Sequence, residues 1–186
     1  MHLKRLLPIS FCLILSFTIQ TDEKSDIFLV DKNLRKNPAF SELEKEMELE
    51  MGIDREPPKS KRTTRINYMN SEGFRCGSFI DKENLEIKIY NNSGLDIGGF
   101  KIIINKRKYT IFPFSSSDII PYMAPFKIDI KRQKLILNKK NFAVGDSIYG
   151  FIDFNINELF ENENSYLPHM GKGYFRTKIS KNKYLN

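Results

Sequence analysis

The side chains that could serve as nucleophile, base or metal ligand are few in this sequence, and their spacing fits no catalytic pattern. His169 and Cys76 are the only histidine and cysteine after residue 20. A lone histidine cannot build a multi-histidine metal site, and no nucleophile-elbow sequence accompanies it. Asp129, Asp146 and Asp153 could still meet in space as a glycosidase-type pair, but nothing in their spacing distinguishes them from exposed aspartates. We therefore predict no catalytic, cofactor-binding or metal-binding residue, and expect that the protein is not an enzyme.

Two further motifs have ordinary structural explanations. We expect Cys76 to be a small buried residue, because a nucleophilic cysteine needs an activating base nearby. If the first 20 residues are removed, Cys76 is the only cysteine left, so no internal disulfide can form and the fold depends on its core. The pair Gly98-Gly99 is more typical of a turn or a bulge than of a phosphate-binding loop.

The first 20 residues have the pattern of a secretory signal. Lys4 and Arg5 precede an apolar run over residues 6–17, and polar residues begin at Thr18. The run is shorter than the roughly 20 residues that span a bilayer. Cys12 follows a bulky phenylalanine inside the run, so we treat it as an ordinary apolar position rather than a lipidated one. We predict a signal peptide or N-terminal anchor over residues 1–20; a buried core helix is the alternative.

Alternating apolar and polar residues between Asn84 and Phe154 predict a series of β-strands. Residues 85–90 alternate regularly, so Leu85, Ile87 and Ile89 should face a core. Residues 101–104 and 109–112 are expected to form a hairpin across a short polar turn. Pro113 lacks a backbone donor and should end the second strand of that hairpin.

The same reasoning places further strands at 66–69, 74–80, 126–131, 135–137, 147–154 and 173–179. The first two should be joined by a turn, the next two should pair across a polar break, and 157–168 should be a long connection. Aromatic residues on both faces of 147–154 indicate a strand covered on both sides. Strands every ~8–12 residues with turn signals between them predict a mainly β fold. We expect an antiparallel β-sandwich, immunoglobulin-like in the loose sense, with one short N-terminal helix.

The best helix candidate is residues 40–51. Ser41 and Glu44 fit a capping box, and Gly52 would end the helix. The glutamates of this segment also alternate at a strand period, but its composition of Glu, Leu, Met and Lys favours a helix. The helix has an apolar stripe of Phe40, Leu43, Met47 and Met51. This stripe would pack on the domain or dock to a partner; otherwise the segment is a marginal, solvated helix.

Charge gives little indication of a polyanionic partner. The formal net charge is +7, and the basic residues are spread along the chain. A cluster of Lys59, Lys61, Arg62 and Arg65 lies beside the acidic helix. It lacks the interleaved aromatics that stack on bases, so we do not expect nucleic acid as a partner. We expect a solvated linker that partly neutralises the helix.

We divide the chain into residues 1–20 (signal or anchor), 21–64 (polar linker with a short acidic helix), 65–180 (β-sandwich) and 181–186 (polar tail). Residues 22–37 are either an extended segment that adds to the sheet or a tether. The expected function is an exported, non-catalytic protein, periplasmic, envelope-associated or secreted, that binds an unknown protein or envelope component or has a structural role. It would meet the membrane only through an uncleaved N-terminus. The alternative is a hydrolase or small-ligand enzyme in the loops, which a pocket lined by two convergent carboxylates or by His169 would indicate.

Overall fold

The computed structural model describes residues 26–49, 59–92, 96–117, 127–160 and 166–181, and this part of the chain is mainly β-structure. Its elements are β1 (Leu29–Val30), a 3-10 helix (Leu34–Lys36), α1 (Pro38–Lys45), β2 (Met47–Leu49), β3 (Lys59–Lys61), β4 (Thr64–Tyr68), β5 (Arg75–Asp81), β6 (Asn84–Asn92), β7 (Asp96–Asn105), β8 (Lys108–Ser117), β9 (Lys127–Leu137), β10 (Ser147–Leu159) and β11 (Tyr166–Ser180). The prediction of a mainly β chain is confirmed.

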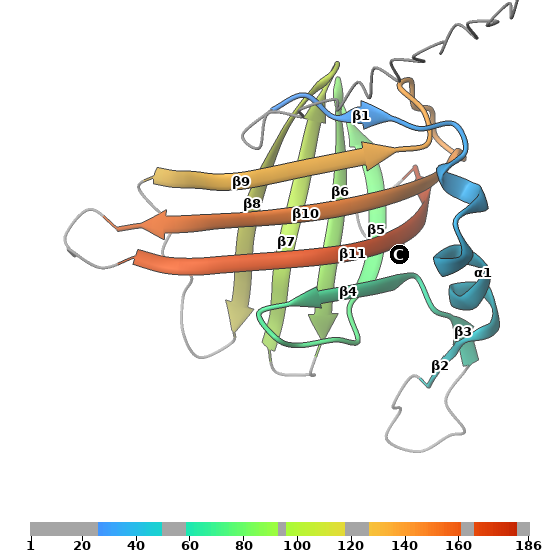
Figure 1. Ribbon diagram of the computed structural model, residues 1–186, viewed down its shortest axis with the longest axis horizontal. Coiled ribbons are helices and arrows are strands. Elements are labelled where there is room, and N and C mark those ends of the chain that lie inside the picture. The colour runs from blue at the N-terminus through green and yellow to red at the C-terminus, as the bar shows by residue number, and fades with distance from the viewer. Residues whose placement is uncertain (1–25, 50–58, 93–95, 118–126, 161–165, 182–186) are drawn as a thin grey trace, which may run out of the picture.

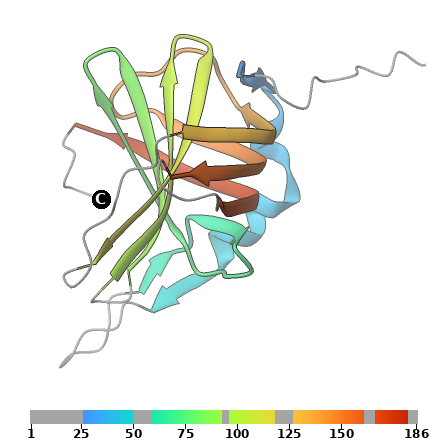
Figure 2. The same cartoon turned by 90° about the vertical axis from the view of Figure 1, so that its left-hand side faces the viewer.

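Nine strands of the described part form one curled sheet. Their order is β1-β9-β10-β11-β5-β6-β7-β8, and β4 pairs with β11 beside this path. Figure 1 shows β4, β9, β10 and β11 crossing β5–β8 at a steep angle, and Figure 2 shows the two halves from the side. The halves join where β11 runs parallel to β5, with Ile179 opposite Ser78. Because this pair and the β1–β9 pair are parallel, the sheet is mixed as well as curled, and an antiparallel sandwich is not confirmed.

The core lies between the two halves of the sheet. Leu85, Ile87 and Ile89 are buried there as predicted, because alternate side chains of a strand point to the same face. The largest fully buried side chains of this core include Phe28, Phe100, Tyr109, Phe154 and Phe175. Burial of this apolar surface is the main term that favours folding.

Residues 26–30 join both edges of the curled sheet at one end. The backbone N–H of Phe28 donates to the carbonyl of Arg107 at 3.2 Å, and that of Tyr109 donates to the carbonyl of Asp26 at 2.7 Å. β1 then pairs in parallel with the end of β9. Of the two predictions for residues 22–37, the segment that adds to the sheet is therefore correct for residues 26–30; residues 22–25 lie outside the described residues.

Helix α1 covers the face of β10 and β11 that points away from the core (Figure 2). The ring of Phe40 lies edge-on to those of Tyr149 and Tyr174, with centroids 5.1 and 5.6 Å apart, and Leu43 is buried beside it. The prediction that the apolar stripe packs on the domain is confirmed for Phe40 and Leu43. The prediction that 147–154 is covered on both faces is also confirmed.

Both ends of the helix differ from the predicted range of 40–51. The side chain of Asn37 accepts a hydrogen bond from a backbone N–H two residues on, at 3.0 Å, so Asn37 is the cap rather than Ser41. The helix ends at Lys45, and β2 follows and pairs with β3. The strand period of the glutamates corresponds to β2, because pairing with β3 supplies the backbone hydrogen bonds that a longer helix would have made. Gly52 lies outside the described residues.

Two arginines of the basic cluster pair with the helix glutamates. Arg62 Nη1 lies 2.6 Å from Glu46 Oε2, and Arg65 forms ion pairs with both Glu42 and Glu46. The prediction that this cluster partly neutralises the acidic helix is confirmed for Arg62 and Arg65.

Replacing Glu46 with glutamine should reduce the loss of stability that the protein shows at acid pH. Hydrogen bonds from Arg62, and next from Arg65, lower the pKa of Glu46 in the folded protein. A carboxyl with a lowered folded pKa contributes stability that is present above its unfolded pKa and lost as the pH falls through its folded pKa. Urea unfolding at a series of pH values should therefore show a smaller loss in acid for Glu46→Gln than for the wild type. The exposed Glu72→Gln is the control, and equal profiles for both variants would contradict the prediction.

Pro113 does not end β8, which continues to Ser117. β8 lies at one end of the sheet path, where β7 is its neighbouring strand. Arg107 and Tyr109 direct their backbone groups away from β7, toward residues 26–28. At the two-residue period of a strand, the nitrogen of Pro113 faces the same way. The missing N–H therefore removes no hydrogen bond to β7, which is the condition under which an edge strand tolerates proline.

β9 is one continuous strand rather than the two predicted at 126–131 and 135–137. Its pairing with β10 skips Lys131, which forms a one-residue bulge. A bulge moves the following side chains to the opposite face. Ile130 and Leu135 are an odd number of residues apart, yet both pack toward the same core for this reason.

β10 and β11 extend beyond the strands predicted at 147–154 and 173–179. They lengthen toward each other, so residues 157–159 and 166–168 of the predicted connection are strand; residues 161–165 lie outside the described residues. This extension brings polar residues of the expected loop onto the core face of the sheet.

β4 and β5 correspond to the strands predicted at 66–69 and 74–80. They go to different halves of the sheet, because β4 pairs with β11 and β5 pairs with β6. The turn between them therefore crosses from one half to the other.

Candidate functional site

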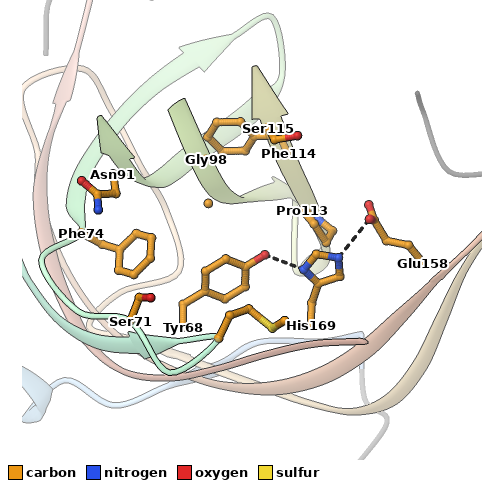
Figure 3. Close-up of a pocket in the computed structure, with 12 residues that line it drawn as sticks. Tyr68, Ser71, Phe74, Asn91, Gly98, Pro113, Phe114, Ser115, Glu158 and His169 are labelled. Carbon is orange, nitrogen blue, oxygen red and sulfur yellow. Dashed lines mark hydrogen bonds and ion pairs between the residues drawn. The ribbon is translucent and has the colours of Figure 1, made fainter. Parts of the chain in front are cut away.

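A pocket of about 370 Å³ opens between the two halves of the sheet (Figure 3). It lies at the ends of β8, β10 and β11 that are remote from residues 26–30. The apolar part of its wall includes Met69, Phe74 and Pro113. The volume falls in the range of ~300–1,000 Å³ that is typical of small-molecule sites.

A chain of three buried polar side chains lines one side of the pocket. Tyr68 Oη and His169 Nδ1 are 2.6 Å apart, and His169 Nε2 and Glu158 Oε2 are 2.9 Å apart (Figure 3). Tyr68, His169 and Glu158 are 7%, 8% and 1% exposed. Hydrogen bonding of this kind is what allows polar groups to be buried without a large cost.

Three different strands position these three side chains. Glu158 lies near the end of β10 and His169 near the start of β11, where β10 and β11 pair in register with Glu158 opposite Leu167. Tyr68 ends β4, which pairs with β11 from the other side, with Tyr68 opposite Gly171. The rings of Tyr68 and His169 are nearly parallel, with centroids 6.0 Å apart and planes 11° apart, and meet through their hydrogen-bonding atoms. The pairing of β4 with β11 is therefore what holds Tyr68 beside His169.

A close approach of backbones makes that pairing possible. Gly173 has φ +152°, and a Cβ built on it would lie 2.0 Å from the carbonyl oxygen of Arg65 and 2.7 Å from Cα of Ile66. Only glycine fits this position without a shift of β4. The glycine at position 173 of β11 thus allows β4 to pair closely with β11.

The electrostatic character of the pocket is set by one carboxylate and one imidazole. Glu158 and His169 line it, and the described lining residues include no lysine or arginine. Both ring nitrogens of His169 contact protein atoms, one on Tyr68 and one on Glu158. Both imidazole nitrogens are therefore engaged with protein partners.

The aspartates considered as catalytic candidates are not brought together at the pocket. Asp129 lies 2.7 Å from the ammonium of Lys131, and Asp153 lies 2.8 Å from Arg132. Asp146 pairs with a lysine at 2.8 Å, and this lysine, with a backbone N–H, lowers the pKa of the Asp146 carboxyl. Each has a surface ion pair, in agreement with their interpretation as ordinary strand and turn residues.

Gly98 and Gly99 lie inside β7 rather than in a turn, and both line the pocket. Their backbones pair with β6 and β8 on either side. A Cβ on Gly99 would lie 2.1 Å from the carbonyl oxygen of Ile89. Gly99 therefore serves close packing of strands at the pocket wall, whereas a Cβ on Gly98 would lie 4.0 Å from its nearest neighbour, the carbonyl oxygen of Phe114.

The sequence interpretation placed Tyr68 in a strand and Glu158 in a connection, and assigned neither a role. A signal for Glu158 was present, because Ile152, Phe154 and Ile156 continue the core-facing alternation directly to it. A carboxylate at a core position needs a buried partner, and His169 is that partner. For Tyr68, the sequence alone carries no sign of the contact with His169, since 101 residues separate them.

Cys76 is buried in the core, as predicted, and is 7% exposed. Burial raises the pKa of its thiol. The thiolate that reacts with disulfide reagents is therefore scarce in the folded protein.

In a chain carrying Cys12→Ser, Cys76 should react with an aromatic disulfide reagent at least about 100-fold more slowly than a cysteine at the exposed position Ser115. Addition of denaturant should remove the difference. The measurement is the rate of release of the chromophoric thiol, and equal rates in the folded state would contradict the burial of Cys76.

Within the described ranges, no three His, Cys, Asp or Glu side chains form a group that could hold a metal ion. No helix in the same residues is long and apolar enough to cross a bilayer. The signal or anchor predicted for residues 1–20 lies outside the described residues.

Comparison of the chain with protein-family models, curated proteins and solved structures finds no match. The chain is accordingly assigned to no enzyme family.

Proposed function

We propose that this chain is an exported, non-catalytic binding protein that holds a small organic molecule at the cell envelope or outside the cell. The observation that carries the proposal is the pocket between the two halves of the curled sheet, with the Tyr68–His169–Glu158 chain on one side. Its volume of about 370 Å³ suits a ligand of one or two rings. The two facing halves act as a rigid sandwich-like scaffold, on which such a pocket is pre-formed.

The composition of the lining supports binding rather than glycoside hydrolysis. Both nitrogens of His169 lie near partners within the protein, at 2.6 Å for Nδ1 and 2.9 Å for Nε2. The lining also contains a single carboxylate among the described residues, whereas glycoside hydrolysis uses two.

The proposal is tested by recovering the protein from its native host and measuring its mass under native conditions. We expect a chain shortened near Gln20 in an exported fraction, carrying a small-molecule adduct. Ser115→Phe should lose the adduct because Ser115 lines the pocket. Thr110→Phe, on the same strand and exposed, is the matched control and should keep it. A full-length cytosolic protein would contradict export, and a wild type without adduct would contradict the binding role.

The alternative is a hydrolase that uses the same pocket. His169 lines the pocket, and this is one of the two features that would indicate such an enzyme. Assay of the full chain against ester and glycoside substrates distinguishes the two functions. Hydrolysis that is abolished by His169→Gln, while the fold is retained, would replace the binding proposal.

A further inference from the structure

The buried polar side chains of the pocket are hydrogen-bonded within the protein. Tyr68 Oη lies 2.6 Å from His169 Nδ1, and Glu158 Oε2 lies 2.9 Å from His169 Nε2. A ligand that bonds to one of these atoms exchanges one hydrogen bond for another, so its net gain is small. The affinity of the pocket for a ligand therefore depends mainly on the rest of its wall.

The rest of the wall is apolar where it is buried. Phe74 is 4% exposed, Pro113 is also buried, and Phe114 is half-buried. The ring of Phe74 meets that of Tyr68 edge-on, with centroids 5.6 Å apart and planes at 81°. Removal of apolar surface from water is favourable in proportion to its area. A hydrocarbon group is therefore the part of a ligand that this interior suits best.

The exposed part of the lining is uncharged among the described residues. It consists of Met69, Ser71, Asn91 and Ser115, and Figure 3 shows the three polar members. Their hydroxyl and amide groups can donate hydrogen bonds to a ligand and accept them. The mouth of the pocket thus suits the polar headgroup of a molecule whose apolar part lies inside.

Exposed apolar side chains gather at the end of the molecule where the pocket opens. Among the described residues, large apolar side chains are exposed at or beside the ends of β4, β7 and β11 that border the pocket: Met69, Ile97, Tyr166, Leu167 and Met170. The others that are exposed, Ile27, Leu29 and Val144, lie toward the opposite end. Exposed apolar surface beside a pocket is typical of a binding groove.

Leu167 continues the apolar surface from the pocket to the outside. It lies opposite Glu158 in the pairing of β10 with β11, so the two side chains are on the same face of the sheet. Glu158 lines the pocket, whereas Leu167 is 46% exposed. A ligand that extends out of the pocket on this side would cover Leu167.

We infer that the pocket binds the linear hydrocarbon tail of a single-tailed amphiphile. The inner part of the tail packs against Phe74 and Pro113, the outer part lies over Leu167, and the polar headgroup stays in water at the mouth. This inference rests on the proposed binding function and adds the class of ligand to it. A compact apolar body would fill the pocket and leave Leu167 exposed, so tail length is the property that distinguishes the two.

Alkyl glucosides with hexyl, octyl and decyl tails test the inference, because tail length changes in this series under one uncharged headgroup. Isothermal titration calorimetry with the full chain, below the micelle-forming concentration of each probe, measures the affinity. Each added pair of methylenes should tighten binding by about 10-fold. Adamantyl glucoside carries as many apolar carbons as decyl glucoside in a compact cage, and it should bind at least about 10-fold more weakly than the decyl compound.

Two pairs of variants locate the tail. Leu167→Asn should weaken decyl glucoside by about 5-fold and change hexyl glucoside by less than about 2-fold, because only the longer tail reaches position 167. Val144→Asn is the matched control, since Val144 is 53% exposed and remote from the pocket, and it should bind both probes as the wild type does. Ser115→Phe narrows the pocket and should weaken every tail length, whereas Thr110→Phe should not.

The outcomes separate the ligand class from the binding function. The inference is overturned by an affinity that does not rise with tail length, by equal affinities for decyl and adamantyl glucoside, or by equal effects of Leu167→Asn and Val144→Asn. Binding that Ser115→Phe leaves unchanged would place the tail outside the pocket and overturn it as well. If no glucoside binds but the native protein carries an adduct, the ligand class is wrong and the binding function stands. If there is neither glucoside binding nor an adduct, the proposed function itself is wrong.

Discussion

Replacing His169 with alanine is expected to lower the free energy of unfolding by about 3–5 kcal/mol. The substitution removes the imidazole that lies 2.9 Å from the carboxylate of Glu158, which is 1% exposed. It also removes the contact between His169 Nδ1 and Tyr68 Oη, which are 2.6 Å apart. Loss of a hydrogen-bonded partner from a buried charge is one of the few single changes with an effect of this size. Urea unfolding followed by circular dichroism measures it.

Glu158→Gln tests whether the buried charge is the cause of this loss of stability. An amide keeps an oxygen that can accept a hydrogen bond from His169 and carries no charge, so this variant alone should cost about 1 kcal/mol. In the double variant of Glu158→Gln with His169→Ala, position 158 carries no charge when the imidazole is absent. We therefore expect the double variant to be more stable than His169→Ala alone, and an additive loss would show that charge burial is not the cause.

Replacing Gly173 with alanine is expected to cost at least about 3 kcal/mol. Gly173 has φ +152°, and a Cβ would lie 2.0 Å from the carbonyl oxygen of Arg65. Backbone strain of this kind costs on the order of 1–3 kcal/mol, and overpacking against backbone costs a comparable amount. Because β4 must move away from β11, the contact between Tyr68 and His169 should be lost as well. Thermal or urea unfolding measures the stability.

Gly145→Ala is the matched control for this prediction. Gly145 also has a positive φ, +89°, but nothing lies within 4 Å of a Cβ built there. It should show the conformational cost alone, about 1 kcal/mol. If Gly173→Ala and Gly145→Ala lose the same stability, close contact between β4 and β11 is not what requires glycine at position 173.

Several strand positions could be predicted from the sequence because they depend on local alternation. Leu85, Ile87 and Ile89 face the core as their period of two indicates, and the 101–112 hairpin forms where its polar turn lies. The prediction was wrong at Pro113 and at the break in β9. The first error arises because the cost of proline depends on whether a strand is at an edge. The second arises because a polar residue that interrupts alternation can be a bulge within one strand as readily as a turn between two.

The helix shows a different kind of error. Residues 38–49 carry both a helical stripe and a strand period, and local preference alone does not choose between them. The structure uses each in turn, with α1 to Lys45 and β2 afterwards. The choice depends on Phe40 and Leu43 packing on β10 and β11, and on the pairing of β2 with β3. Both are tertiary contacts.

By itself, the sequence determined the mainly β class, the faces of the regular strands and the burial of Cys76, because each follows from the types of neighbouring residues. Tertiary structure alone decided the curl of the sheet and its parallel pairs, because these depend on which distant strands meet. It also decided the pocket. Glu158 and His169 lie 11 residues apart on the consecutive strands β10 and β11, but Tyr68 lies 101 residues before His169, and the three form one hydrogen-bonded group only where β4 pairs with β11. No spacing in the sequence encodes that meeting, since it is set by the packing of the whole core.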